Sequence, residues 1–244
     1  MEQRILKVTD NTRIADRVYR MVLENPALEE MKPGQFVNIR IDGQYLRRPI
    51  SVCDSDLGSL TIVYKVVGRG TEALSRVKKR ETLDVLTGLG NGYDLSKAGD
   101  HPLLLGGGVG VPPLVLLARK LREAGRAVTA VLGFNTAAEA FGQTDFREMG
   151  CRVTVTTADG SLGVRGFVTD ALPEDYSYFY TCGPEPMLKA VYRKTKTSGQ
   201  FSFEERMGCG FGACMGCSCK TVTGYKRICR EGPVLEKEEI LWED

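Results

Sequence analysis

Hydrophobic and polar side chains alternate in short runs along the first 97 residues, and this period of two is typical of strands with one buried face. Glycine and proline separate many of the runs, and one short helix is expected over 72–77. Regularly spaced short strands predict a small antiparallel barrel or sandwich. The expected strands cover residues 18–23, 35–41, 50–52, 60–67 and 83–86.

The pattern changes near residue 99, where strand-like apolar runs begin to alternate with helical stretches. This alternation is the signature of a parallel, doubly wound sheet. We expect strands at 103–105, 128–134, 153–156, 178–180 and 201–203, and helices at 112–124 and 185–195. The chain is therefore predicted to be a multidomain α+β protein: an antiparallel β-barrel over 1–98, an α/β parallel-sheet nucleotide-binding domain over 99–200 and a small cysteine-rich tail over 201–244.

Composition narrows the chemistry that the chain can perform. The formal net charge is +2, which gives no general attraction to nucleic acid or to a membrane surface. No apolar run is long enough to span a bilayer and the start lacks an apolar leader, so a cytoplasmic location is expected. Five of the eight cysteines fall between 209 and 229, and His101 is the only histidine. Redox work must then lie in a cofactor, in cysteine or in a partner protein.

The densest candidate site is the run Cys209-x4-Cys214-x2-Cys217-x11-Cys229. Plant-type 2Fe–2S proteins use the Cys-x4-Cys-x2-Cys…Cys spacing, because a tight loop supplies three thiolates and a later segment supplies the fourth. Structural zinc usually needs two Cys-x2-Cys pairs or Cys/His pairs, and only one such pair occurs here. Cys219 could replace Cys217, although the spacing favours Cys217.

Two loops of the second part carry nucleotide-binding features. Gly106, Gly107, Gly108 and Gly110 lie between an apolar strand and a helix, where backbone N–H groups can face a pyrophosphate. The dinucleotide fingerprint Gly-x-Gly-x-x-Gly is not met, so an ordinary Rossmann dehydrogenase is not expected. After a different strand, which ends at Thr157, Asp159 could accept from a ribose hydroxyl. The second loop, 181–187, closes a strand and opens a helix, and there Cys182 could border the nicotinamide as the candidate catalytic residue, followed by Gly183 and Pro184.

A further candidate site lies in the barrel. Arg48 could neutralise a flavin pyrophosphate through paired hydrogen bonds, and the turn at Gly70 and Thr71 could offer backbone N–H groups to the same phosphates. The remaining candidate flavin contacts are Pro49, Ile50, Ser51, Tyr64 and Lys65.

Together these motifs resemble the ferredoxin–NADP reductase superfamily, which pairs a flavin-binding barrel with a nicotinamide-binding α/β domain. Residues 48–51 resemble its Arg-x-Tyr-Ser motif, with Ile50 in place of the aromatic residue. Residues 106–113 resemble its pyridine-nucleotide loop, and residues 182–184 resemble its Cys-Gly-Pro motif.

The cysteine-rich segments 205–219 and 225–233 are very similar to those of the electron-transfer subunits of class 1B dihydroorotate dehydrogenases. This resemblance implies FAD, a 2Fe–2S cluster on Cys209, Cys214, Cys217 and Cys229, and NAD as substrate. It also implies an FMN-containing catalytic partner in an α2β2 heterotetramer of pyrimidine biosynthesis. The alternatives are a related FAD and 2Fe–2S subunit, of sulfhydrogenase or ferredoxin–NADP type, and a cluster-based redox sensor.

Overall fold

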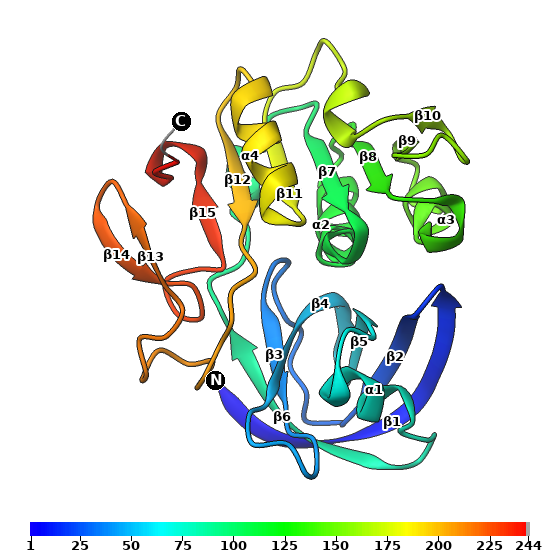
Figure 1. Ribbon diagram of the computed structural model, residues 1–244, viewed down its shortest axis with the longest axis vertical. Helices are drawn as coiled ribbons and strands as arrows, with labels where there is room; N and C mark the ends of the chain where they lie inside the picture. Colours follow the sequence, from blue (N-terminus) through cyan, green and yellow to red (C-terminus); the bar gives the residue numbers. More distant parts are fainter. Residues whose placement is uncertain (243–244) are drawn as a thin grey trace.

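The computed structural model describes residues 1–242, and its first six strands close into an antiparallel barrel (Figure 1). The predicted barrel is confirmed, and its strands follow the order β1-β2-β5-β4-β3-β6. The interior is filled by side chains such as Leu6, Val37, Ile62 and Val85, all fully buried. The strands are β1 Glu2–Ala15, β2 Val18–Glu24, β3 Phe36–Ile39, β4 Arg48–Asp56, β5 Ser59–Lys65 and β6 Thr82–Leu89.

Two features of the barrel differ from the sequence expectation. Strand β1 was not predicted, because only Leu6 and Val8 are fully buried along its fourteen residues and no alternation stands out. Helix α1 spans Arg69–Ser75 rather than 72–77. Its early start follows from Thr71, whose Oγ1 accepts from the backbone N–H of Val67 at 2.9 Å and ties the preceding turn.

The second part is a seven-stranded sheet of order β10-β9-β8-β7-β11-β12-β15, parallel except for β15. Alternate strand residues face opposite layers. Leu104 and Leu132 pack with helix α2 on one face, whereas Leu105 and Val131 pack with helix α4 on the other. The elements are β7 Leu103–Gly107, α2 Pro113–Glu123, β8 Thr129–Phe134, α3 Gln143–Glu148, β9 Arg152–Thr157, β10 Val164–Arg165, β11 Phe179–Cys182, α4 Glu185–Lys194, β12 Gly199–Ser202 and β15 Val234–Glu236.

The cysteine-rich segment leaves this sheet after β12 and returns to it as β15. Between them lies a small hairpin of β13 Ser218–Thr221 and β14 Gly224–Arg227, which is drawn in orange beside β15 in Figure 1. Short 3₁₀ turns complete the fold: η1 Leu95–Lys97, η2 Gly108–Gly110, η3 Ala137–Glu139, η4 Val168–Asp170 and η5 Lys237–Glu239. We keep the division 1–98, 99–200 and 201–244 as a proposal, with β12 crossing its second boundary and residues 243–244 outside the described residues.

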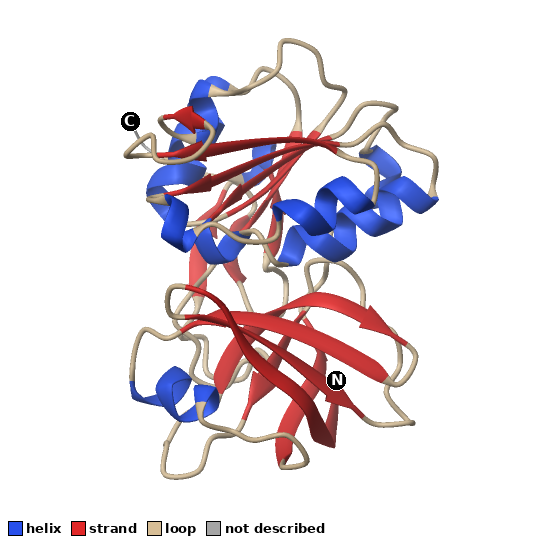
Figure 2. Ribbon diagram, turned by 90° about the vertical axis from the view of Figure 1, so that its right-hand side faces the viewer, coloured by secondary structure: helices blue, strands red, loops and turns tan. Residues whose placement is uncertain are grey.

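The barrel sits against the sheet domain through helix α2 and strand β4 (Figure 2). Arg119 on α2 donates to Asp54 Oδ1 at 2.6 Å and to the Ser55 carbonyl at 2.7 Å, both on β4. Arg119 also lies 3.1 Å from Asp56 Oδ1. These bonds link the two domains directly. Within residues 1–242 no helix has the length and apolar character needed to cross a membrane.

Replacing Arg119 with Met should lower the free energy of unfolding by about 1–2 kcal/mol, because partly exposed charged hydrogen bonds across the domain contact are lost. Urea unfolding followed by circular dichroism measures the change. Arg152→Met, on the exposed side of β9, is the matched control and should leave the midpoint unchanged. Equal midpoints for both variants would show that the contact contributes nothing to stability.

Candidate functional site

The strand order reverses between β7 and β11, and this reversal creates a crevice at the carboxyl ends of the two strands. Going along the chain, β8 and β9 are added to the sheet on one side of β7. The later strands β11 and β12 are added on its other side. Ligands in open α/β sheets bind at such switch points. Both predicted loops, 106–110 and 182–184, begin there, so the structure brings the two motifs together.

The two loops touch so closely that Gly107 and Gly110 have no room for a side chain. A Cβ on Gly110 would lie 2.3 Å from the carbonyl oxygen of Cys182. A Cβ on Gly107 would lie 2.4 Å from Met187 Sδ, at the start of helix α4. Gly107 and Gly110 are therefore needed for close packing, whereas an added Cβ on Gly108 would meet open space and this residue instead has a φ of +52°.

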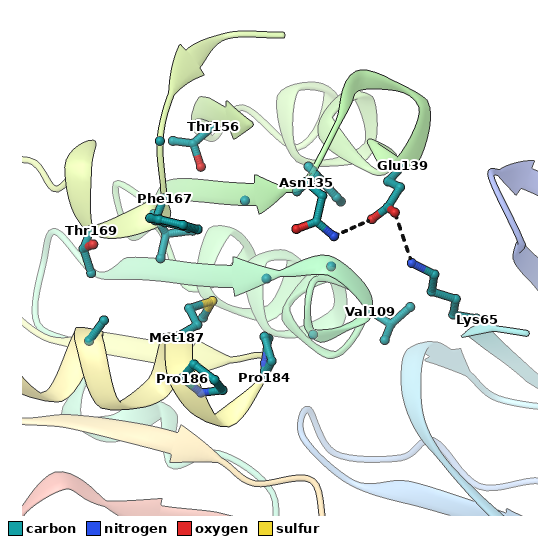
Figure 3. A pocket seen from close by; sticks show the side chains of 18 of the residues that line it. Lys65, Val109, Asn135, Glu139, Thr156, Phe167, Thr169, Pro184, Pro186 and Met187 are labelled. Atoms are coloured by element: carbon teal, nitrogen blue, oxygen red, sulfur yellow. Dashed lines mark hydrogen bonds and ion pairs between the residues drawn. The ribbon is translucent and has the colours of Figure 1, made fainter. Parts of the chain in front are cut away.

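A cavity of about 500 Å³ opens from this crevice toward the barrel (Figure 3). Its size suits a small-molecule or cofactor ligand. Lys65 at the end of β5 and Val18 at the start of β2 form the barrel side. The sheet side includes the glycine loop, Pro184, Met187 and Phe167. Gly107, Gly108, Gly110 and Pro184 thus lie where a nucleotide site was predicted.

An ion pair crosses the cavity between the two domains. Lys65 Nζ lies 3.4 Å from Glu139 Oε1, and Asn135 Nδ2 donates to Glu139 Oε2 at 3.1 Å (Figure 3). Glu139 and Asn135 were not singled out from the sequence. The feature of the sequence that could have revealed both residues is their position directly after strand β8, at the carboxyl edge of the sheet.

Cys182 lies at the end of β11 and is almost completely buried. Burial raises the pKa of its thiol, and the nearby Glu204 carboxylate raises it further, so the thiol is neutral. Such a thiol is not suited to act as a nucleophile. Cys182 lies outside the residues that line the cavity, so its place beside the nicotinamide stays a prediction. Glu204, which also went unnoticed in the sequence, lines the cavity just after β12, and desolvation raises the pKa of its partly open carboxyl group.

Asp159 occupies the loop after β9, outside the residues that line the cavity. Its carboxylate accepts from the backbone N–H and the hydroxyl of Ser161, at 3.0 and 2.6 Å. These bonds lower the pKa of the Asp159 carboxyl group. A ribose contact for Asp159 stays a prediction.

The predicted flavin residues meet on the barrel. Arg48 opens β4, and its guanidinium lies over the first turn of α1: a Cβ on Gly70 would lie 2.3 Å from Arg48 Nε. Gln44 Oε1 accepts from Arg48 Nη2 at 2.9 Å and orients the group. Arg48, Gly70 and Thr71 thus lie together on the barrel surface, with Arg48 supplying the positive charge, although about twenty residues separate the two motifs.

The other barrel candidates differ in accessibility. Pro49, Ile50 and Ser51 follow Arg48 along β4 and are all half-buried. Tyr64, in contrast, is buried inside the barrel, where its hydroxyl donates to Asn11 Oδ1 at 2.9 Å and its ring stacks on Tyr19. Only its backbone remains for a ligand, so a flavin contact for Tyr64 stays a prediction.

The four cysteines of the spacing motif are arranged as two neighbouring pairs. The backbone N–H of Cys214 donates to Cys209 Sγ at 3.4 Å, and that of Cys229 donates to Cys217 Sγ at 3.4 Å. Within residues 1–242, no three His, Cys, Asp or Glu side chains are grouped so as to hold a single metal ion. Two pairs of thiols are the arrangement that two irons need, with two thiolates on each.

The loop around the first pair favours thiolate. Partial burial opposes ionisation of Cys209, but backbone N–H groups, that of Phe211 foremost, outweigh it and lower its pKa to about 6. The Ala213 N–H donates to Cys209 Sγ at 3.2 Å. Gly210 and Gly212 have φ of +79° and +93°, which allows the loop to wrap inward. The donor set and its N–H groups fit an iron–sulfur cluster.

Cys219 stands apart on strand β13, where it pairs with Lys226 of β14. Partial burial raises the pKa of its thiol. Arg227 closes the loop from the other side, donating to the Gly212 carbonyl at 2.7 Å and to Glu231 Oε2 at 2.9 Å.

Comparison with known proteins agrees with this arrangement. Residues 204–241 match the iron–sulfur cluster binding domain of dihydroorotate dehydrogenase B. A dihydroorotate dehydrogenase B (NAD(+)) electron transfer subunit from a Geobacillus species is 42% identical over 99% of each chain. One from Fusobacterium nucleatum is 43% identical over 96% of each chain.

Among solved structures, an NADH-dependent reduced ferredoxin–NADP oxidoreductase studied for flavin-based electron bifurcation superposes with a TM-score of 0.89. It is 33% identical and covers 97% of this chain and 90% of its own. The superfamily resemblance read from the sequence is thereby confirmed. The chain belongs to the family of dihydroorotate dehydrogenase B electron transfer subunits.

Proposed function

We propose that this chain passes electrons from the FMN of a separate dihydroorotate-oxidising subunit, through a 2Fe–2S cluster and FAD, to NAD. The observation that carries the proposal is the meeting of three sites. The cavity at the β7/β11 crevice faces the barrel, and the cysteine loop abuts the same barrel. NAD exchanges two electrons as hydride and an iron–sulfur cluster exchanges one, so the flavin, which does both, is needed between them.

The residues of this chain bind and orient, and they do not carry out acid–base chemistry on dihydroorotate. Arg48 and the α1 turn provide charge and N–H groups for the FAD pyrophosphate. The glycine loop and residues 182–184 hold NAD at the crevice. His101, the only histidine, is exposed on the loop before β7 and lies outside the residues that line the cavity.

The catalytic partner is expected to reach the cluster loop directly. Phe211 and Met215, on either side of Cys214, are 41% and 54% exposed, and Tyr225 on the hairpin is 73% exposed. Apolar side chains around a redox site suit a protein interface. An α2β2 heterotetramer in the cytoplasm follows from the family resemblance.

A second candidate deserves a test because the ferredoxin–NADP oxidoreductase matches almost the whole chain. The same cofactors would then serve another acceptor. Co-purification with an FMN subunit, together with bleaching of the flavin absorption of that complex by dihydroorotate, would support the first function. The absence of both would favour the second.

Replacing Cys209, Cys214, Cys217 or Cys229 with Ala should abolish the 2Fe–2S absorption and EPR signals, because one of the two irons then loses one of its two thiolates. Cys219→Ala is the matched control and should retain both signals. Loss of the cluster in Cys219→Ala with retention in Cys217→Ala would show that the ligand set is wrong.

Arg48→Ala should weaken FAD binding roughly 10- to 100-fold, since hydrogen bonds from a charged group are each worth about 1.5–3 kcal/mol. Ser51→Ala and Thr71→Ala test the same site. Flavin released on gel filtration is the measurement, and Arg152→Ala is the control. Undiminished FAD content in Arg48→Ala would remove this residue from the site.

The isolated chain with its cofactors should oxidise NADH with ferricyanide or dyes, and should not oxidise dihydroorotate. Adding the FMN subunit should restore NAD reduction by dihydroorotate. A variant without the cluster should lose this coupled reaction and keep NADH–FAD reduction. Dihydroorotate turnover by the isolated chain, or coupled activity without the cluster, would contradict the proposed function.

A further inference from the structure

The flavin barrel holds the cysteine loop through one buried amide. Asn38 on β3 is 1% exposed, and its Nδ2 donates to the backbone carbonyl of Cys209 at 3.2 Å. In the β3–β4 register Asn38 lies opposite Pro49, within the strand that carries Arg48 and Ser51. A single strand pairing thus separates the first cysteine ligand from the proposed flavin strand.

Two observations show that this contact is closely constrained. A Cβ on Gly210 would lie 2.3 Å from Asn38 Nδ2, so the loop can approach only because residue 210 is glycine. Asn38 Oδ1 is also buried and has no hydrogen-bond partner among the described residues. An unpaired buried acceptor is unfavourable for stability, so an apolar side chain would suit this position better if packing were its only role.

A second asparagine of the barrel holds the segment that carries the fourth ligand. Asn91, just after β6, donates from Nδ2 to the carbonyls of Glu231 and Val234 at 3.1 and 2.7 Å. Its Oδ1 accepts from the Val234 N–H at 3.1 Å, and its own N–H donates to the Gly232 carbonyl at 2.8 Å. The barrel domain therefore hydrogen-bonds to both halves of the cysteine segment, through Asn38 and Asn91.

We propose that Asn38 is a positioning residue that fixes the cluster loop at a set distance from the flavin strand, with Asn91 as the second anchor. The inference rests on the proposed function, because it takes residues 48–51 as the flavin strand and the cysteines as cluster ligands. With both cofactors bound, a hydride from NADH would supply two electrons to FAD, of which one would pass to a ferric ion of the cluster and the other would remain on the flavin. By holding the cluster loop, Asn38 would set the distance between the flavin and the cluster that this electron crosses.

The test uses the full-length chain with FAD and cluster, in the wild type and in Asn38→Leu. Rapid mixing with NADH should show flavin bleaching at the wild-type rate and reduction of the cluster slowed about tenfold, since small misplacements of reacting groups are costly. Iron loss to a chelator should be about tenfold faster, as for other groups that support metal ligands. Asn25→Leu is the matched control, because Asn25 bonds the Ile5 carbonyl on the barrel.

Asn91→Ala provides the second variant, since it removes the bonds to the carbonyls of Glu231 and Val234 without placing a side chain in the ligand loop. It should reproduce both defects, and it decides the matter if Asn38→Leu does not fold. Wild-type rates of cluster reduction and iron loss in the folded variants would overturn the inference. A wild-type chain that binds no FAD or no 2Fe–2S cluster would instead contradict the proposed function.

Discussion

The antiparallel pairing of β15 with β12 is the interaction on which the rest of the arrangement depends. It returns the chain to the edge of the sheet after the cysteine segment, so that residues 203–233 form an excursion anchored at both ends. Without this pairing the four thiols would sit on a free tail. With it, Asn91 can bond both Glu231 and Val234, and the excursion is pressed against the barrel.

The same geometry explains why the barrel stands at the centre of the proposed electron path. Lys65 at the end of β5 faces the cavity, Arg48 on β4 lies over α1, and Asn38 on β3 bonds the cysteine loop. Three neighbouring strands of one sheet thus serve three sites. Arg119 holds the sheet domain against β4 through its bond to Asp54.

Much of this protein could be predicted from the sequence because its signals are local. Turn residues between alternating runs indicate the barrel, and alternating strands and helices indicate the parallel sheet. Helices α2 and α4 lie within a residue of their predicted ends. The spacing of Cys209, Cys214 and Cys217 is likewise local, since a tight loop must bring three thiolates to one cluster.

Contacts between distant segments were decided only by the tertiary structure. Strand β1 has few buried residues and no clear period, and β15 is too short to recognise, so both depend on partners elsewhere in the chain. Tyr64 turned inward to the barrel core, and Glu139 and Glu204 came to line the cavity. The sequence by itself determined the cofactor chemistry, because ligand spacing and glycine turns are written in short segments. Packing decided which strand holds the cluster loop, because the bond between Asn38 and Cys209 joins residues 171 positions apart.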